Sequence, residues 1–144
     1  MTNPTLRTPW HLWGVGVLGI LWYLIGLYDF SSTILRETTY TAYFSKEMHA
    51  FYDAMPWWAI IAWGGAEFSG ITGGILLLRK SRFAVNALIA ALIFIFVNSI
   101  YNFVIKNAEK ALGEAAFYFE ALVIVSTVSF LMYALRMRQT GIIR

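Results

Sequence analysis

Three carboxylates, Asp29, Glu67 and Glu120, lie inside long apolar stretches of the sequence. A charged side chain at the centre of a bilayer costs about 2.5–3.5 kcal/mol on insertion scales, and residues of this kind commonly mark ligand sites or proton paths. Burial favours the protonated form of a carboxyl group. Glu67 could therefore donate a hydrogen bond between helices, exchange a proton or contact a ligand, and the sequence leaves these three alternatives open.

Two asparagines and two tyrosines accompany the carboxylates. Asn98 and Asn102 are four residues apart, so both amides project from one face of a helix. Tyr101 is next to this pair, and Tyr28 precedes Asp29. Such groups either join helices through hydrogen bonds or bind a ligand. With the carboxylates they form the predicted ligand- or proton-binding set: Tyr28, Asp29, Glu67, Asn98, Tyr101, Asn102 and Glu120.

Several other chemistries are not expected. The chain has no cysteine, which excludes disulfides, thiolate nucleophiles and cysteine-ligated metal centres formed by this chain alone. Di-iron bundles use Glu-x-x-His, whereas Gly70 and Val123 occupy the histidine positions. The two histidines, His11 and His49, are predicted on opposite sides of the membrane and cannot hold one haem between them. We therefore predict no metal and no cofactor, and no motif indicates an activated serine or threonine nucleophile.

The elements that position these groups follow from hydropathy. Hydrophobic residues make up 59% of the 144 residues and charged residues only 13%, with a mean hydropathy of +0.63. A soluble domain carries about 25% charged residues, so a soluble globule is excluded. Four stretches exceed the roughly 20 residues that span a bilayer. We predict an all-α, integral membrane four-helix bundle in one domain, with helices at 10–34, 56–78, 83–105 and 115–135.

The charged flanks predict the topology. One side carries only basic residues: Arg7, Arg79, Lys80, Arg82, Arg136, Arg138 and Arg144. The other side mixes Arg36, Lys46, Lys106 and Lys110 with five acidic residues. The positive-inside rule then places both termini in the cytoplasm of a multi-pass protein of a bacterial inner membrane. Basic residues confined to these flanks suit anionic lipid headgroups, and no nucleic-acid partner is expected.

Depth along the helices predicts where the polar residues meet. Glu67 falls near the membrane midplane, and Asp29 and Glu120 fall nearer the outer surface, where they are expected to be partly hydrated. The inner half is mainly aliphatic. We therefore predict a polar cavity in the outer half that opens away from the cytoplasm. Gly70 and Gly74 form a GxxxG-like pair that lets another helix approach closely.

The outer loop between the first two helices is long enough for structure of its own. Apolar residues recur at helical spacing through 41–55, while Lys46, His49 and Asp53 share the opposite face. This pattern predicts an amphipathic helix at the outer surface. It either seals the bundle or acts as a lid over a site.

A faint internal echo links the first and third helices. Leu27-Tyr28-Asp29-Phe30 matches Ile100-Tyr101-Asn102-Phe103, and each precedes an outer loop and a helix with one glutamate. Two parallel hairpins from a duplication would place these residues in pseudo-symmetric positions. Chance matches between aromatic-rich helices explain the pattern equally well.

The segment from Trp63 to Phe103 resembles the DoxX-like group of small bacterial membrane proteins. The resemblance rests on Gly65-Ala66-Glu67, on the 73–78 run and on Arg79-Lys80-Ser81-Arg82. It implies a four-helix inner-membrane protein linked to redox partners, in some cases to quinone-dependent complexes. The whole chain also resembles short, uncharacterised bacterial membrane proteins that carry a loose "sugar transporter" label.

Three functions remain open from the sequence. The first is a module that binds or transports a small solute or couples to protons, with a homodimer as the working unit. The second is an accessory or structural subunit of a membrane complex. The third is an enzyme that acts on a lipid or quinone at the outer leaflet, with a carboxylate as general acid or base. The expected partners are membrane lipids and a small-molecule ligand, besides a second copy or the complex.

Overall fold

The computed structural model describes residues 7–144, which form helices and no strand. Four helices are long and apolar enough to cross a membrane, which confirms the prediction of an all-α chain with four candidate membrane spans. They are α1 (Trp10–Ile34), α4 (Trp57–Leu78), α5 (Phe83–Ser99) with its continuation η1 (Ile100–Ile105), and α7 (Ala115–Gln139).

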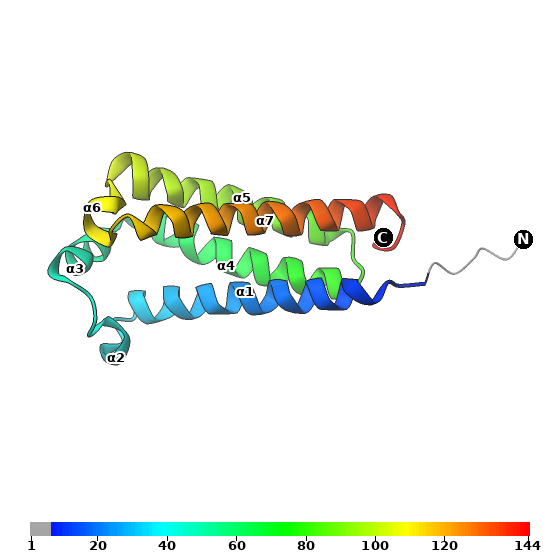
Figure 1. Cartoon of the computed structure of the whole chain (residues 1–144), viewed down its shortest axis with the longest axis horizontal. Coiled ribbons are helices and arrows are strands. Elements are labelled where there is room, and N and C mark those ends of the chain that lie inside the picture. The colour runs from blue at the N-terminus through cyan, green and yellow to red at the C-terminus, as the bar shows by residue number, and fades with distance from the viewer. Residues whose placement is uncertain (1–6) are drawn as a thin grey trace, which may run out of the picture.

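Three short helices gather at one end of the bundle (Figure 1). These are α2 (Thr38–Thr41), α3 (Lys46–Asp53) and α6 (Ala108–Leu112), and we call their end the loop end. The opposite end, here the terminal end, holds the start of α1, the 79–82 turn and the C-terminal residues (Figure 1). The long helices therefore alternate in direction, as a chain that crosses a bilayer four times requires.

The turn at 79–82 makes α4 and α5 antiparallel neighbours. Lys80 adopts a left-handed conformation with φ of 57°. The Lys80 N–H donates to the Leu77 carbonyl and the Ser81 N–H to the Leu76 carbonyl, both at 2.9 Å, which is the Schellman pattern of a helix end. Backbone bonds of 2.9 Å from Arg144 to Lys80 and from Arg82 to Arg144 tie the segment after α7 to this turn.

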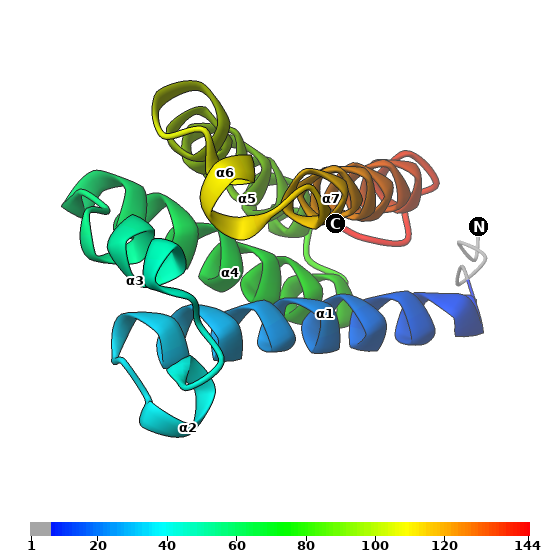
Figure 2. The ribbon, with the colours of Figure 1, turned by 60° about the vertical axis from the view of Figure 1, so that its left-hand side comes forward.

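The long helices pack in the order α1, α4, α5 and α7 (Figure 2). Glycines let α1 and α4 approach closely: a Cβ on Gly16 would lie 3.6 Å from the Gly74 carbonyl oxygen, and a Cβ on Gly70 would overlap the Tyr23 ring. The predicted role of Gly70 and Gly74 at a helix interface is thus confirmed.

Side chains join α1 to α7 in the terminal half. Tyr23 and Thr127 are hydrogen-bonded at 2.8 Å. Because the Thr127 hydroxyl donates to the Val123 carbonyl, Tyr23 is the donor to Thr127. Nearer the terminal end, His11 Nδ1 lies 2.5 Å from the Tyr133 hydroxyl. The ring of four helices is therefore closed at this level.

Three predicted segments differ in detail from the structure. The helix expected over 115–135 extends to Gln139 as α7. The helix expected over 83–105 is α-helical only to Ser99 and continues as a π-helix, in which the Lys106 N–H reaches back five residues to the Tyr101 carbonyl at 3.0 Å. The amphipathic segment expected over 41–55 contains α3, and the chain also forms α2 before it. In α3, Phe51 is buried and His49 is exposed, so its apolar face is the one turned toward the bundle.

Candidate functional site

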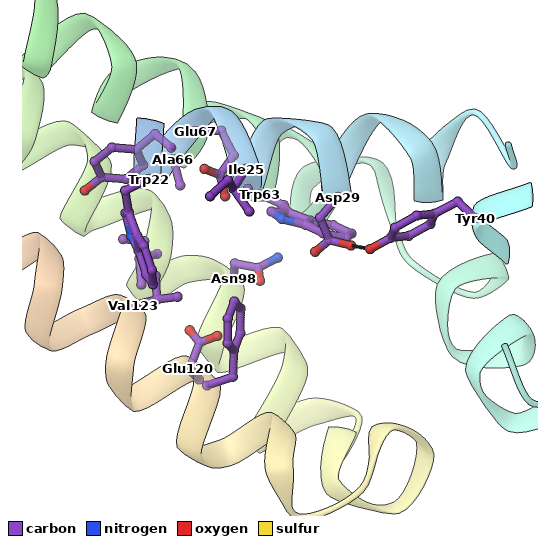
Figure 3. A pocket seen from close by; sticks show the side chains of 14 residues that line it. Trp22, Ile25, Asp29, Tyr40, Trp63, Ala66, Glu67, Asn98, Glu120 and Val123 are labelled. Carbon is purple, nitrogen blue, oxygen red and sulfur yellow. Dashed lines mark hydrogen bonds between the residues drawn. The ribbon is translucent and has the colours of Figure 1, made fainter. Parts of the chain in front are cut away.

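All three membrane carboxylates line one cavity of about 320 Å³ that extends from the middle of the bundle toward the loop end. Figure 3 shows Asp29, Glu67 and Glu120 turned toward a common space, with the Asn98 amide between them. Helices α1, α4, α5 and α7 each contribute to the wall, and α2 adds one residue, Tyr40. Residues more than 90 positions apart in the sequence thus meet in one site.

Asp29 is held by the loop between α1 and α4. The Tyr40 hydroxyl on α2 donates to its Oδ1 at 2.5 Å (Figure 3). Burial, and then the hydrogen bond and negative charge of Asp29, raise the pKa of Tyr40 above its ordinary value. The phenol therefore stays protonated at neutral pH and keeps its role as a donor.

Glu37 supports Tyr40 by capping α2. Its side chain accepts hydrogen bonds from the Thr39 N–H at 3.1 Å and the Tyr40 N–H at 2.6 Å. These two bonds hold the pKa of the Glu37 carboxyl below its usual range, because they favour the ionised form. A surface carboxylate thus fixes the short helix whose tyrosine binds Asp29.

Glu120 and Asn98 have partners on the neighbouring helices. The Ser99 hydroxyl is hydrogen-bonded to the Glu120 carboxyl. The Asn98 amide donates to the Ala59 carbonyl at 3.2 Å and its Oδ1 accepts from Asn102 at 2.8 Å. Asn98 therefore links α5 to α4.

Glu67 differs from the other two carboxylates. Among residues 7–144 no hydrogen bond to its side chain is present, and Asn98 is engaged elsewhere. Gly26 on α1 lies opposite, so close that any Cβ there would overlap the Glu67 carboxyl group. The hydrogen-bonded role between helices, one of the three alternatives for Glu67, is thus not observed, and its oxygens face the cavity.

The rest of the wall is aromatic. Trp22, Trp63 and Phe119 line the cavity beside the carboxylates. The ring of Tyr52, on α3, stacks on Trp63 at 5.8 Å between centroids, which fixes that indole from behind. Burial, and to a smaller extent the charge of Asp29, raise the pKa of Tyr52 to about 12. No lysine, arginine or histidine belongs to the described lining.

We infer from the exposed part of its lining that the cavity opens at the side of the bundle between α1 and α7. Two of its lining residues are strongly exposed, Ile25 on α1 at 67% and Phe119 on α7 at 58%. Nearer the terminal end, the hydrogen bond between Tyr23 and Thr127 closes the boundary between α1 and α7, which we call the seam. The mouth therefore lies in the apolar part of the helices, where a bilayer would meet it.

Tyr28 and Tyr101 do not converge on the cavity. Tyr28 is 62% exposed, and Tyr101 is 1% exposed, with its hydroxyl donating to the Ala54 carbonyl at 3.2 Å. Successive residues of an α-helix point about 100° apart, so Tyr28 cannot share the face of Asp29. The two tyrosines of the internal echo thus have opposite environments.

Asn102 lies in an adjoining cavity of about 110 Å³ that shares Asp29, Asn98 and Glu120 with the larger one. Its Oδ1 is buried and has no hydrogen-bond donor among the described residues. Five of the seven predicted residues therefore line two neighbouring cavities that share part of their wall.

Some residues of the site carry no signal in the sequence. Tyr40 sits in a surface loop, and Ser99 is one hydroxyl among many. Gly26 is recognisable only once Glu67 is placed against it. Within residues 7–144 no group of three acidic, histidine or cysteine side chains is close enough to hold a metal ion. The three carboxylates therefore lie around the cavity and do not meet at one position where an ion could bind them all.

No protein-family model matches this sequence, and no curated protein and no solved structure matches it either. The resemblance to the DoxX-like group and to the "sugar transporter" proteins therefore stays a prediction.

Proposed function

We propose that this chain is a multi-pass protein of a bacterial inner membrane that binds a small solute in the carboxylate cavity, as part of transport or of proton-coupled binding. The observation that carries the proposal is the convergence of Asp29, Glu67 and Glu120 from three helices on one cavity. Isolated carboxylates in a membrane are costly, and a packing role would leave a carboxyl group hydrogen-bonded to another helix, as Asp29 and Glu120 are. Glu67 has no such partner among the described residues.

The distribution of charge supports an orientation with both termini in the cytoplasm. The flanks at the terminal end carry basic residues only, and the loop end carries both signs. In this orientation the cavity lies in the outer half of the membrane. A solute would then reach it from the outer side or from the lipid beside it.

The orientation is testable because the chain has no cysteine of its own. Single cysteines replace Ser81, in the 79–82 turn, and Glu114, just before α7. A membrane-impermeant maleimide applied to spheroplasts is expected to label the variant at position 114 at once and the variant at position 81 only after permeabilisation. The reverse pattern would place the cavity in the cytoplasmic half.

The binding function is tested by native mass spectrometry on protein extracted in native-lipid particles. Wild type is compared with Glu67→Gln, which keeps the size of the side chain and removes its charge. Glu114→Gln, at the exposed loop end, is the matched control. We expect a bound small molecule in wild type and in the control and its loss in Glu67→Gln, and the same spectra report the number of copies in the assembly.

Two results would reject parts of this proposal. A bundle without a bound molecule, joined to a second polypeptide and unchanged by Glu67→Gln, would favour the accessory-subunit function. Ligand binding by Glu67→Gln with an unchanged pH dependence would argue against proton coupling.

A further inference from the structure

The described cavity wall contains three acidic side chains, Asp29, Glu67 and Glu120, and no basic side chain. Arg36, on the loop after α1, is paired with Asp53 at 2.9 Å, well exposed at the surface. A ligand that brings positive charge would complete the site, because a buried charge is stabilised by an opposite charge nearby. An anionic ligand would add to the repulsion.

The hydrogen-bonding capacity left in the site is mainly that of acceptors. A carboxylate offers about four acceptor positions. Among the described residues, the Asp29 and Glu120 side chains each have one hydrogen-bond partner, and the Glu67 side chain has none. In the adjoining space, the buried Oδ1 of Asn102 also lacks a donor. The Asn102 oxygen is not part of a carboxylate, and it too would accept a hydrogen bond from a ligand with N–H groups.

The aromatic wall suits the same kind of group. Trp22, Trp63 and Phe119 stand beside the carboxylates in the lining. The face of an aromatic ring attracts a cation, most strongly when the cation is an organic ammonium group with little hydration. A metal ion would instead need several oxygens at one point, and the described residues hold no such cluster.

The mouth between α1 and α7 indicates that the part of the ligand away from its polar head is apolar. Ile25 and Phe119 flank it, both of them apolar and exposed. The cavity, at about 320 Å³, is at the small end of ligand sites, which run from about 300 to 1,000 Å³. A polar head and one ring or short chain would fill it, and a longer tail would leave through the mouth into lipid.

We propose that the cavity takes an amphiphilic organic cation, an ammonium head on an apolar body, which enters from the lipid between α1 and α7. This inference rests on the proposed binding function and names its ligand class. The ammonium head sits among Asp29, Glu67 and Glu120, and the apolar body lies against the aromatic wall.

The test compares two probes that differ only in their head group, 4-phenylbutylammonium and 4-phenylbutanol. Binding is measured by titration calorimetry on the full chain in lipid nanodiscs, with empty nanodiscs subtracted. In wild type we expect the ammonium probe to bind at least tenfold more tightly than the alcohol. Glu67→Gln should reduce this ratio toward one, and Glu114→Gln should leave it unchanged.

A second variant guards against a folding defect. Gly26→Ala keeps all three carboxylates but forces the Glu67 carboxyl to move, so we expect it to weaken ammonium binding more than alcohol binding. Sideways entry is tested by octadecylammonium placed in the nanodisc lipid. Its tail is too long for the cavity, so competition with the short ammonium probe requires an opening to lipid, and a lack of competition would overturn that part.

The outcomes separate this inference from the binding function. Equal affinity for the two probes in wild type would overturn the ligand class while leaving a binding cavity in place. An ammonium preference that survives in Glu67→Gln, Asp29→Asn and Glu120→Gln would overturn the placement of the head. Binding of neither probe would overturn the inference as a whole, and a molecule that copurifies with wild type alone would then still support the binding function.

Discussion

The two halves of the bundle are built on opposite principles. In the terminal half, an apolar cluster that includes Leu12, Val85 and Ala134 is almost fully buried, and α1 is joined to α7 across it. In the loop half, the apolar cluster is smaller and centres on Phe51 and Tyr101, where it joins α3 to the end of α5. There, α1 and α7 contribute the exposed residues Ile25 and Phe119 to the lining of the carboxylate cavity. The described hydrogen bonds between these two helices lie in the terminal half.

The difference shows how a chain of 144 residues combines a packed bundle of apolar helices with a polar site. In lipid, helix association depends on close packing and on hydrogen bonds between helices, because lipid chains are as apolar as leucine. Glycines and a Tyr–Thr bond supply both in the terminal half. In the loop half, the short helices add contacts to those between the long helices, such as the hydrogen bond from Tyr40 on α2 to Asp29.

Gly70→Val should lower the stability of the bundle most, because it disrupts the packing of α1 on α4 in the terminal half. A Cβ at Gly70 would overlap the Tyr23 ring, and overpacking of this kind costs about 3 kcal/mol. Unfolding in mixed detergent and SDS micelles measures the change. Gly14→Val is the matched control, since nothing lies within 4 Å of a Cβ at that position. Equal losses in the two variants would mean that this interface does not stabilise the bundle.

The four helices were predictable because hydropathy and charge act on whole segments. Apolar runs long enough to span a bilayer form helices whatever their neighbours, since no other structure satisfies their backbone groups there. The antiparallel arrangement of α4 and α5 was predictable too, because a connection of four residues, 79–82, is too short for any other arrangement of two long helices. The π-helical end after Ser99 was missed, because hydropathy and charge do not distinguish a π-helix from an α-helix.

Tyr23→Phe should have a moderate effect, since it removes the bond across the closed part of the seam. Tyr23 donates to Thr127 at 2.8 Å, and hydrogen bonds between membrane helices average about 0.6 kcal/mol. The same micelle assay should show a loss of that size. Tyr28→Phe, at an exposed position, should show none. If both variants match wild type, the seam is held by packing alone.

Glu67→Gln should change stability less than Gly70→Val or Tyr23→Phe while abolishing ligand binding. The carboxyl has no hydrogen-bond partner among the described residues, so replacing it with a neutral amide breaks no observed contact. We expect an unfolding free energy within about 0.5 kcal/mol of wild type, as for substitutions that remove no packing or paired group. A loss as large as that of Gly70→Val would show that Glu67 supports the fold and would weaken the binding proposal.

The contrast between Tyr28 and Tyr40 explains why the candidate site was only partly predictable. Asp29, Glu67 and Glu120 were recognisable because a charge in an apolar run is costly wherever the helices pack. Which tyrosine reaches Asp29 depends on the path of the loop. Adjacency in sequence favoured Tyr28, yet its side chain points away, and Tyr40 arrives from eleven residues further on.

Glu37→Gln should have the smallest effect, confined to the cap that holds Tyr40 in place. Because the pKa of Glu37 is lowered in the folded protein, its capping contribution is present above the ordinary pKa of 4.5 and is lost as the pH falls through the lowered value. In wild type, the amide proton shifts of Thr39 and Tyr40 should therefore titrate together in NMR spectra below pH 4.5. In Glu37→Gln they should stay flat over the same range, with global unfolding unchanged. If the titration persists in the variant, it belongs to another carboxylate. Glu37 would then not be the group that holds α2 and Tyr40 in place.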